Sequence, residues 1–394
     1  MSSSKLLVAV IDIGTTYSGY AFSITSRKEK VYTYNWNTAS FKNSTSILFS
    51  PRRAFHSFGY KAEQHFAMLS HTGENRDWYF FKMFKLLLNK HENLNEKTML
   101  SDYTGKKMLA IDVFSGGIKY MKEHLFTHFE ERIPMLMDGD IHWVMTIPAV
   151  WHNTAQMFIR KSAEKAGIRT DQFTIALEPE SAALYCLLEF HRSGLSHVQS
   201  GQKFLLVDCG HRTVEVTIME VLNDYSVTKI QATSGGPWGG IHVDDAFQEY
   251  LLEIFNYKLL VSLSRNDISD LERNFNILKK TVDMIDKIYK MCLPFSLRQA
   301  AKPEMLIAGR LRIDSKVLTA FFDKPIKNIC NHIQDILFSF KLHDTNTLML
   351  VGEFAESKIL HEKIQINFPN IRVLTPNYPA CAVVLGAVES GHCI

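Results

Sequence analysis

The sequence carries the segment LLVAVIDIGTTYSGYAFSI at residues 6–24, where two apolar runs flank an aspartate, a glycine and two threonines. A second segment, FLLVDCGHRTVEVTI at residues 204–218, repeats this order about two hundred residues later. Each copy predicts a strand, a turn and a second strand, because short apolar runs bounded by turn signals are typical of buried strands. Glycine at the bend lets backbone N–H groups close around a phosphate, since no Cβ stands in the way. The repeat therefore indicates two similar lobes that hold a nucleotide.

An aspartate ends the first strand of each copy, Asp12 in one and Asp208 in the other. Carboxylate oxygens suit Mg²⁺, which prefers oxygen ligands and keeps most of its waters. We expect these two aspartates to hold a hydrated Mg²⁺ between the copies. The alternative for Asp12 is that it only closes a hairpin turn.

Composition and charge are those of an ordinary globular protein. The chain has 394 residues, 46% of them hydrophobic and 22% charged, and this length favours two domains. A net charge of +3 without a long Lys/Arg run argues against a nucleic-acid partner. No apolar stretch approaches the roughly twenty residues of a membrane span, and residues 1–4 are not a signal peptide. The sequence therefore predicts a cytoplasmic protein.

The cysteines support the same compartment. Their spacing is not that of a metal site, so we expect free thiols in a reducing environment. The chain has six of them: Cys186, Cys209, Cys292, Cys330, Cys381 and Cys393.

Strand and helix patterns alternate along the chain, as in an α/β protein. Short strands are expected at residues 47–49 and 55–58, and a buried strand at 143–147. Apolar residues at helical spacing predict a helix over 113–130, and a second helix is expected from an N-cap at Asn153 to Ala166.

The second half of the chain continues the pattern. Residues 188–202 are rich in turn formers and are the best candidate for the crossing between lobes. Residues 244–292 are expected to be mostly helical, and residues 348–352 to form a final core strand.

An ordered series of motifs resembles the superfamily of actin, sugar-kinase and 70-kDa heat-shock ATPases, and within it the divergent branch of heat-shock 70 kDa protein 12 (12A- and 12B-like). One glycine turn would be weak support, but the series runs nearly end to end. It comprises AVIDIGTTYSGYA (9–21), FHSFGY (55–60), RDW (76–78), GKKM (105–108), TIPAVW (146–151), ALEPESA (176–182), SGGP (234–237), LPFS (293–296) and LVGEFAES (350–357).

The resemblance implies an α/β protein with the actin-like ATPase (ribonuclease H-like) fold, in which two duplicated lobes surround a nucleotide cleft. We expect lobe I over residues 1–200, with a peripheral subdomain at about 55–142. Lobe II is expected over 201–394, with a peripheral subdomain at about 241–345. The implied cofactors are ATP or ADP and Mg²⁺.

The resemblance also implies roles for residues of the two turns. Phosphate contacts are expected from Gly14, Thr15, Thr16, Tyr17, Gly210 and Thr213, and water-mediated Mg²⁺ contacts from Asp12 and Asp208. Glu178 would orient the attacking water, with a helix cap as its alternative. For Thr213 the alternative is an ordinary strand threonine.

Further contacts are implied around the rest of the nucleotide. A lysine should reach the γ-phosphate; Lys85 aligns best and Lys82 is the rival, and either could instead lie on a solvated helix face. Gly235 and Gly236 resemble a turn near the phosphates and ribose, or form only a connecting loop. Cationic stems of Lys279 and Lys280 would lie over the adenine, unless they are plain surface lysines. Gly352, Glu353 and Phe354 correspond to the adenosine turn.

Departures from the family pattern affect hydrolysis more than binding. The family's second turn reads Asp-Cys-Gly-Gly-Gly-Thr-Val-Asp, so His211 and Arg212 replace two glycines and Glu215 replaces an aspartate. Where such a turn needs positive φ, each replacement adds strain of roughly 1 kcal/mol or more. Conversely, Arg212 could give its guanidinium to the phosphates. Glu353 brings a carboxylate where the family has a glycine.

We expect an ATP-binding, chaperone-like protein with weak or absent hydrolysis, whose lobe closure is biased by nucleotide and presents a surface to a protein partner. One alternative is a small-molecule phosphotransferase of the sugar-kinase type, with Asp244 or Asp245 as base. The other is a pseudo-ATPase interaction module that no longer binds nucleotide. In that case Arg212→Gly with His211→Gly would restore affinity.

Overall fold

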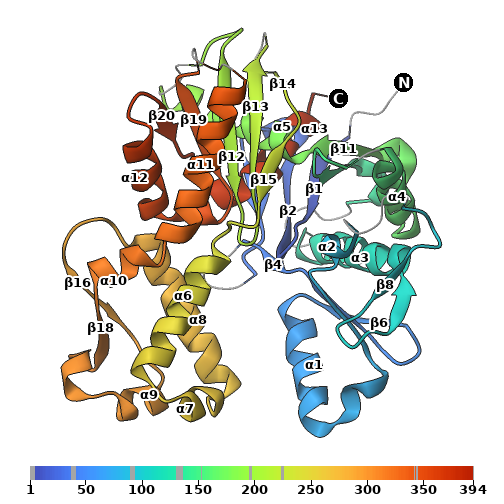
Figure 1. Ribbon diagram of the computed structural model, residues 1–394. Coiled ribbons are helices and arrows are strands. Elements are labelled where there is room, and N and C mark those ends of the chain that lie inside the picture. The colour runs from blue at the N-terminus through green and yellow to red at the C-terminus, as the bar shows by residue number, and fades with distance from the viewer. Residues whose placement is uncertain are drawn as a thin grey trace. The chain divides into compact units, whose positions relative to one another are not determined.

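A computed structural model describes residues 5–36, 41–88, 94–129, 136–151, 153–194, 198–222, 226–340, 342 and 345–393. The chain divides into two compact units (Figure 1). Unit 1 comprises residues 1–188, 225–227 and 381–394, and unit 2 comprises 189–224 and 228–380. The predicted lobe limits and subdomains stay a prediction, and residues 195–197 of the expected crossing lie outside the described residues.

Unit 1 is built on a sheet in the order β11-β10-β1-β2-β3, with β4 paired to β2. Its strands are β1 (Leu7–Ile13), β2 (Tyr17–Ile24), β3 (Val31–Thr33), β4 (Asn43–Ser44), β10 (Ile141–Ile147) and β11 (Phe173–Leu177). β2 runs antiparallel to β1, whereas β10 runs parallel to β1 and β11 parallel to β10. β10 confirms the buried strand expected at 143–147.

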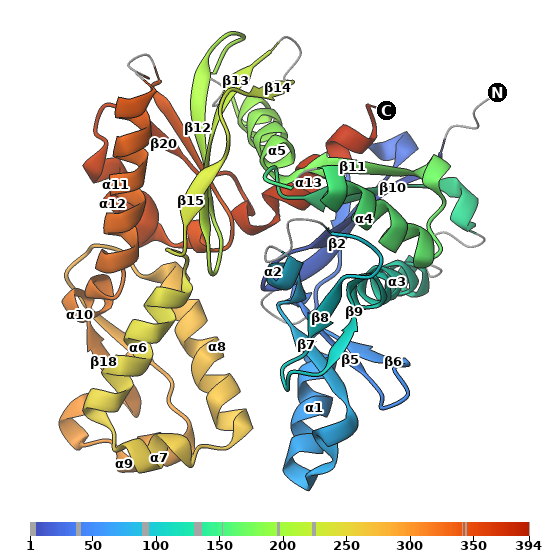
Figure 2. The same cartoon turned by 45° about the vertical axis from the view of Figure 1, so that its right-hand side comes forward.

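Helices cover both faces of this sheet, which explains why every residue of β1 is buried. Alternate residues point to opposite faces of a strand. Leu7, Ala9 and Ile11 belong to the same core as residues of α3 (Ala110–Phe129) and α4 (Asn153–Lys165). Val8 and Val10 pack instead with α13 (Ala382–Gly391), from the end of the chain. Figure 2 shows α3, α4 and α13 around the sheet.

The remaining elements of unit 1 include the strands and helix predicted from its first half. They are α1 (Tyr60–Thr72), α2 (Phe84–Leu88), α5 (Glu178–Arg192), β5 (Ser46–Phe49), β6 (Phe55–Phe58), β7 (Tyr79–Lys82), β8 (Met99–Ser101) and β9 (Lys107–Leu109). β5 lies between β6 and β7, and β8 pairs with β9. The strands expected at 47–49 and 55–58 are confirmed. The helix expected at 113–130 is confirmed to Phe129, and residue 130 lies outside the described residues. α4 begins at Asn153 itself, one residue earlier than an N-cap there implies, and ends at Lys165.

Unit 2 repeats the plan with the sheet order β14-β13-β12-β19-β20, and β15 pairs with β13. Its strands are β12 (Lys203–Cys209), β13 (Val214–Val221), β14 (Val227–Lys229), β15 (Ser234–Gly236), β19 (Thr347–Val351) and β20 (Arg372–Leu374). Again the second strand is antiparallel to the first and the next two are parallel. β19 confirms the strand expected at 348–352, but it is not the final strand, because β20 follows it.

Helices and a small sheet complete unit 2. They are α6 (Ile241–Ile254), α7 (Tyr257–Val261), α8 (Arg265–Thr281), α9 (Phe295–Ala300), α10 (Ser315–Ala320), α11 (Asp323–Ser339), α12 (Lys358–Asn367), β16 (Ile288–Met291), β17 (Leu306–Ile307) and β18 (Arg310–Asp314). Phe247 of α6 stacks on Phe275 of α8 with ring centroids 3.8 Å apart. The helical content expected over 244–292 is therefore confirmed as far as β16.

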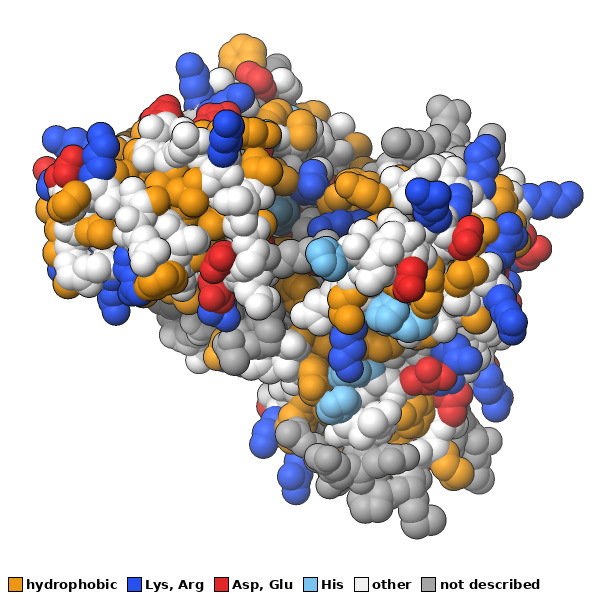
Figure 3. Space-filling view, turned by 90° about the horizontal axis from the view of Figure 1, so that it is seen from below, with side chains coloured by type: hydrophobic (Ala, Val, Ile, Leu, Met, Phe, Trp, Pro, Cys, Tyr) orange, Lys and Arg blue, Asp and Glu red, His pale blue; other side chains and the backbone are white. Residues whose placement is uncertain are grey.

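The surface agrees with the modest net charge. Figure 3 shows one face on which Lys/Arg and Asp/Glu side chains are interspersed and several histidines are visible. All six cysteines are free thiols, as predicted. Among the described residues no helix is both long enough and apolar enough to cross a bilayer.

Candidate functional site

The two turns have the same strand register. The last pair of β1 and β2 is Ile13 with Ser18, and the last pair of β12 and β13 is Cys209 with Val214. Four residues therefore connect the strands in each copy, 14–17 in the first turn and 210–213 in the second. Asp12 and Asp208 stand one residue before these last pairs, so the sequence repeat is a repeat of structure.

Both turns keep backbone donors for an anion. Within the described parts of the chain, the N–H groups of Thr15 and Thr16 in the first turn have no acceptor. The same holds for Arg212 and Thr213 in the second turn. Adjacent backbone N–H groups that converge in a turn form a concave anion site. These donors fit the phosphates expected from the sequence.

Asp12 lies deep in the first site, 3% exposed. Its Oδ2 accepts a hydrogen bond from Lys42 Nζ at 2.9 Å, and its Oδ1 accepts one from Thr146 Oγ1 at 2.9 Å. Burial acts to raise the pKa of Asp12, but the charges of Lys42 and Lys85 and these two hydrogen bonds outweigh it. The pKa therefore lies below its usual value, and the carboxylate is ionised near neutral pH.

Glu178 and Lys85, both predicted catalytic residues, form an ion pair. Glu178 is the first residue of α5, and its Oε1 lies 2.5 Å from Nζ of Lys85. The lysine ammonium also lies 5.7 Å from the ring centre of Trp151. Burial raises the pKa of Glu178, against the opposing charge of Lys85. The rival lysine, Lys82, pairs instead with Glu63 at 3.1 Å.

The second turn is held from outside by a neighbouring backbone segment. Gly210 N donates to Thr213 O at 2.9 Å, and Ile241 N donates to His211 O at 2.7 Å. A Cβ at Gly239 would lie only 2.4 Å from His211 O, so only glycine allows this approach. His211 and Arg212 do not have positive φ, since the described non-glycine residues that do are Arg53, Met83, Ala308 and Tyr378. The strain anticipated for the two replaced glycines is therefore absent.

Arg212 supplies a further donor beside this turn. Its Nε is buried and, among the described residues, has no hydrogen-bond partner. A buried N–H without an acceptor costs about 1–3 kcal/mol, more when the group is charged. The guanidinium therefore favours an anionic ligand at the second turn.

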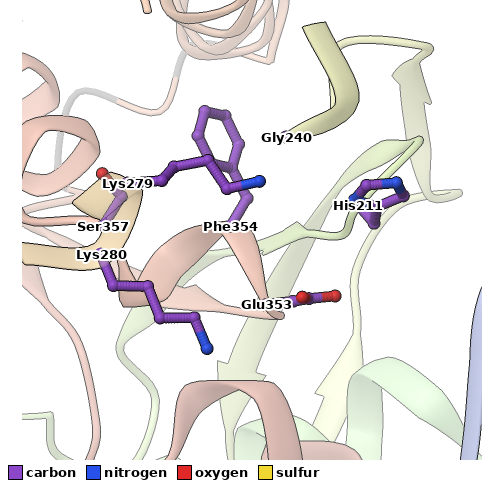
Figure 4. Close-up of a pocket in the computed structure, with 7 residues that line it drawn as sticks. All are labelled: His211, Gly240, Lys279, Lys280, Glu353, Phe354 and Ser357. Atoms are coloured by element: carbon purple, nitrogen blue, oxygen red, sulfur yellow. The ribbon is translucent and has the colours of Figure 1, made fainter. Parts of the chain in front are cut away.

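A pocket in unit 2 gathers several residues predicted to contact the adenosine. Its lining is His211, Gly240, Lys279, Lys280, Glu353, Phe354 and Ser357. Figure 4 shows Lys279 and Lys280 on one side and Glu353 with His211 on the other. The cavity volume is about 10 Å³, roughly the space of one water molecule, so the pocket is too small for a nucleoside as its side chains now lie. Ser357 Oγ is buried there without a hydrogen-bond partner among the described residues.

Acidic partners engage both pocket lysines. Lys279 Nζ lies 2.6 Å from Asp244 Oδ1, and Lys280 Nζ lies 2.5 Å from Glu356 Oε2. Burial raises the pKa of Asp244, although Lys279 acts against this. A nucleoside would have to displace these long side chains to enter.

The glycines predicted to lie near the nucleotide have different structural roles. Gly352 has φ +90°, and a Cβ there would lie 2.4 Å from Asp208 Oδ1, so its backbone lies beside the aspartate of the second turn. Gly235 and Gly236 are not a turn but belong to β15, paired with Glu215 and Val214 of β13. A Cβ on Gly235 would lie 1.9 Å from Val214 O, so close strand packing is the physical reason for glycine there.

The surroundings of Asp12 do not fit a metal ion. Both carboxylate oxygens already accept hydrogen bonds, one of them from an ammonium. No cluster of three or more His, Cys, Asp or Glu side chains that could hold a metal occurs in the parts of the chain that the structure describes. A metal bound directly to Asp12 would therefore have to displace the ammonium of Lys42, and the water-mediated Mg²⁺ contact expected of Asp12 stays a prediction.

Sequence reasoning missed Lys42, Thr146 and Ser357. Thr146 was accessible in principle, because β10 runs parallel to β1 with Ile11 opposite Met145, which brings Thr146 to the strand end occupied by Asp12. Lys42 precedes β4, a strand of two residues that no periodicity reveals. Ser357 follows a short 3-10 helix, and only its burial marks it.

Comparisons with known proteins agree with these features. The family described as Hsp70 protein matches residues 75–352, more than half of the chain. Heat shock 70 kDa protein 12B of Homo sapiens is 29% identical, with 99% of this chain and 69% of that protein covered. Heat shock 70 kDa protein 12A of Homo sapiens is 27% identical, with 98% and 70% covered. Chaperone protein HscA of Buchnera aphidicola subsp. Baizongia pistaciae (strain Bp) is 26% identical, with 71% and 48% covered.

These matches confirm the resemblance stated from the sequence motifs, including the likeness to heat-shock 70 kDa protein 12. They also confirm the predicted actin-like ATPase fold, because this family has that fold. The duplicated sheet order of the two units agrees with it. The chain belongs to the Hsp70 protein family.

Proposed function

We propose that this chain binds ATP and ADP, hydrolyses ATP weakly or not at all, and uses the nucleotide to bias lobe closure for a protein partner. Membership of the Hsp70 family implies nucleotide binding together with a divalent metal. The identity of the nucleotide, the extent of hydrolysis and the partner are the proposed parts. Mg²⁺ enters this function on the phosphates of the nucleotide, since Asp12 is already paired.

The buried Nε of Arg212 carries the proposal of nucleotide binding. Among the residues that the structure describes, this Nε has no acceptor, and neither do the neighbouring backbone N–H groups of Arg212 and Thr213. Arginine holds phosphate oxygens with directed, charge-assisted hydrogen bonds. A phosphate at the second turn would satisfy these donors together, which supports phosphate as the ligand.

Weak hydrolysis is supported by the pair of Lys85 and Glu178. A γ-phosphate contact by Lys85 and a water contact by Glu178 each need the side chain to leave its partner, 2.5 Å away. Positioning of these groups decides turnover more than it decides binding, because binding is spread over many contacts. The raised pKa of Glu178 still suits a proton acceptor, so slow turnover fits better than none.

The other two readings gain less support. In the sugar-kinase hypothesis Asp244 or Asp245 is the base. Both oxygens of Asp244 contact Lys279, at 2.6 and 2.9 Å, and Asp245 Oδ2 lies 3.8 Å from His242 Nδ1. The pseudo-ATPase hypothesis rested on His211, Arg212 and Glu353, and the strain expected at the first two is absent because neither has positive φ. A cytoplasmic location is proposed on the free cysteines, which suit a reducing compartment.

Isothermal titration with Mg·ATP and with ADP tests the proposal, followed by single-turnover hydrolysis. We expect both nucleotides to bind, with Arg212→Ala weakening each at least about tenfold, as expected for a lost hydrogen bond to a charged group. Arg310→Ala, which changes an exposed arginine of the same unit, is the matched control and should leave affinity unchanged. Absence of binding by a folded sample to either nucleotide would contradict the proposal.

A further inference from the structure

The aspartate of the first turn already has a cation. Lys42 Nζ lies 2.9 Å from Asp12 Oδ2, and the two side chains are 21% and 5% exposed. This is closer than the distance of about 4 Å at which an ion pair is usually counted. The second oxygen, Oδ1, accepts a hydrogen bond from Thr146. Asp12 is thus compensated in charge and in hydrogen bonding by this chain alone.

The local backbone holds Lys42 in place. β4 follows it directly and pairs with the start of β2, with Ser44 opposite Tyr17 and Asn43 opposite Ser18. Gly19, which pairs with Asp12 across the hairpin, lets this segment approach, since a Cβ there would lie 3.1 Å from Phe41 O. The position of the ammonium is therefore fixed by strand pairing and by a missing Cβ, and not by the ion pair alone.

The charges near Asp12 leave little attraction for a dication. Asp12 and Glu178 supply two negative charges, and their partners Lys42 and Lys85 supply two positive charges. A divalent ion would add two charges to a set that is already neutral and would have to displace the ammonium from Oδ2. Because the two ion pairs balance in charge, they exert little net attraction on an added cation as long as the ammonium of Lys42 stays on Oδ2.

We propose that Lys42 serves as the resident cation of Asp12 and thereby makes nucleotide binding by this chain nearly independent of divalent metal. The inference rests on the proposed nucleotide binding and concerns the first turn. Lys42 acts here as a positioning residue that compensates Asp12, and the phosphates meet the backbone N–H groups of Thr15 and Thr16.

ADP titrations in excess EDTA and in Mg²⁺ provide the test. The measured quantity is the dissociation constant in EDTA divided by the dissociation constant in Mg²⁺. The wild-type ratio should stay within about threefold, whereas Lys42→Met should raise it at least about tenfold (1.4 kcal/mol), because Asp12 then needs an added cation. Lys42→Arg keeps the charge and should restore a low ratio. Lys107→Met, at an exposed lysine of the same unit, is the matched control.

A second arm needs no nucleotide. Mn²⁺ binding to the nucleotide-free protein, followed by electron paramagnetic resonance, should be at least tenfold tighter for Lys42→Met than for wild type. If Lys42→Met does not fold, two other variants replace it. Lys42→Arg keeps the cation and the double variant Asp12→Asn/Lys42→Met removes the carboxylate, so both should bind Mn²⁺ as weakly as the wild type.

The outcomes separate the two proposals. ADP binding that strengthens tenfold or more with Mg²⁺ in the wild type overturns the inference and leaves nucleotide binding intact. Failure of ADP to bind in any buffer overturns the proposed function, and the Mn²⁺ arm then decides the inference. Equal Mn²⁺ affinity of wild type and Lys42→Met, or tight Mn²⁺ binding by Lys42→Arg or by the double variant, overturns it.

Discussion

The turn after β1 and the turn after β12 share strand register and length, yet the residues around them differ. In the first, Gly19 lies opposite Asp12 and allows Lys42 to approach the carboxylate. In the second, Glu215 lies opposite Asp208. The first turn keeps its donors on the backbone, whereas the second adds the buried Arg212 Nε. The same backbone turn therefore carries a carboxylate paired with a lysine in unit 1 and an arginine N–H available to an anion in unit 2.

This difference shows where duplicated folds diverge. The hydrogen-bonded ladder and the sheet order are fixed by burial on both faces and are the same in each unit. The residue opposite the aspartate is not fixed by burial in this way. It is a glycine in one copy and a glutamate in the other, and this difference determines which side chains can approach the aspartate. The charge beside each aspartate thus depends on a neighbour of the turn as much as on the turn itself.

Removing the lysine of each Lys–Asp pair should give the largest effect. Lys42→Met leaves Asp12, whose side chain is 5% exposed, as an uncompensated buried charge, and should lower the free energy of unfolding by about 3 kcal/mol. Lys279→Met leaves Asp244, whose side chain is 23% exposed, and should cost about half as much. Urea unfolding of both variants measures the difference. Equal losses would mean that the two aspartates are equally buried in solution.

Substitution of a turn glycine by alanine should give the next largest loss of stability, and the loss should differ between the two turns. A Cβ at Gly14 would lie 2.2 Å from Tyr17 O, whereas one at Gly210 would lie 3.0 Å from Thr213 O. Gly14→Ala should therefore destabilise by about 2 kcal/mol or more, and Gly210→Ala by about 1 kcal/mol. Thermal unfolding followed by circular dichroism provides the measurement. A larger loss of stability for Gly210→Ala than for Gly14→Ala would contradict the closer packing found at Gly14.

Restoring glycine in the second turn should bring no gain. His211 lacks positive φ, so His211→Gly relieves no strain and should lower stability by about 0.5–1 kcal/mol through added freedom of the unfolded chain. A rise in the unfolding midpoint would show that the turn is strained after all.

The pH dependence should differ in sign between Asp12 and Asp244. The pKa of Asp12 is lowered on folding, so its contribution is present above about pH 4 and is lost as pH falls further. Asp12→Asn should therefore lose less stability on acidification below pH 4.

The pKa of Asp244 is raised, so its contribution is present below about pH 4 and is lost as pH rises. Asp244→Asn should lose more stability on acidification, as measured by urea unfolding between pH 5 and 3.

Much of the fold was accessible from the sequence, because its signals are local. Apolar runs ending in Asp12 and Asp208 predicted both hairpins, and helical spacing predicted α3. The set of pocket residues Lys279, Lys280 and Glu353 came from the resemblance, and the structure does bring them together.

Partners across long sequence distances were not accessible in this way. Lys42 reaches Asp12 from a strand too short to show a pattern, and Glu178 meets Lys85 across 93 positions of sequence. The backbone angles of His211 and Arg212 depend on the segment 239–241 that packs against their turn. Such contacts arise from tertiary packing, which a single sequence does not encode in its spacing.

A crystal structure of the chain with ADP and Mg²⁺ tests the central claim most directly. We expect a phosphate oxygen within hydrogen-bond distance of Arg212 Nε. Lys42 Nζ should still contact Asp12 Oδ2, and any metal should lie on the phosphates. A metal ion held by Asp12, with Lys42 displaced and Arg212 away from the phosphates, would contradict it.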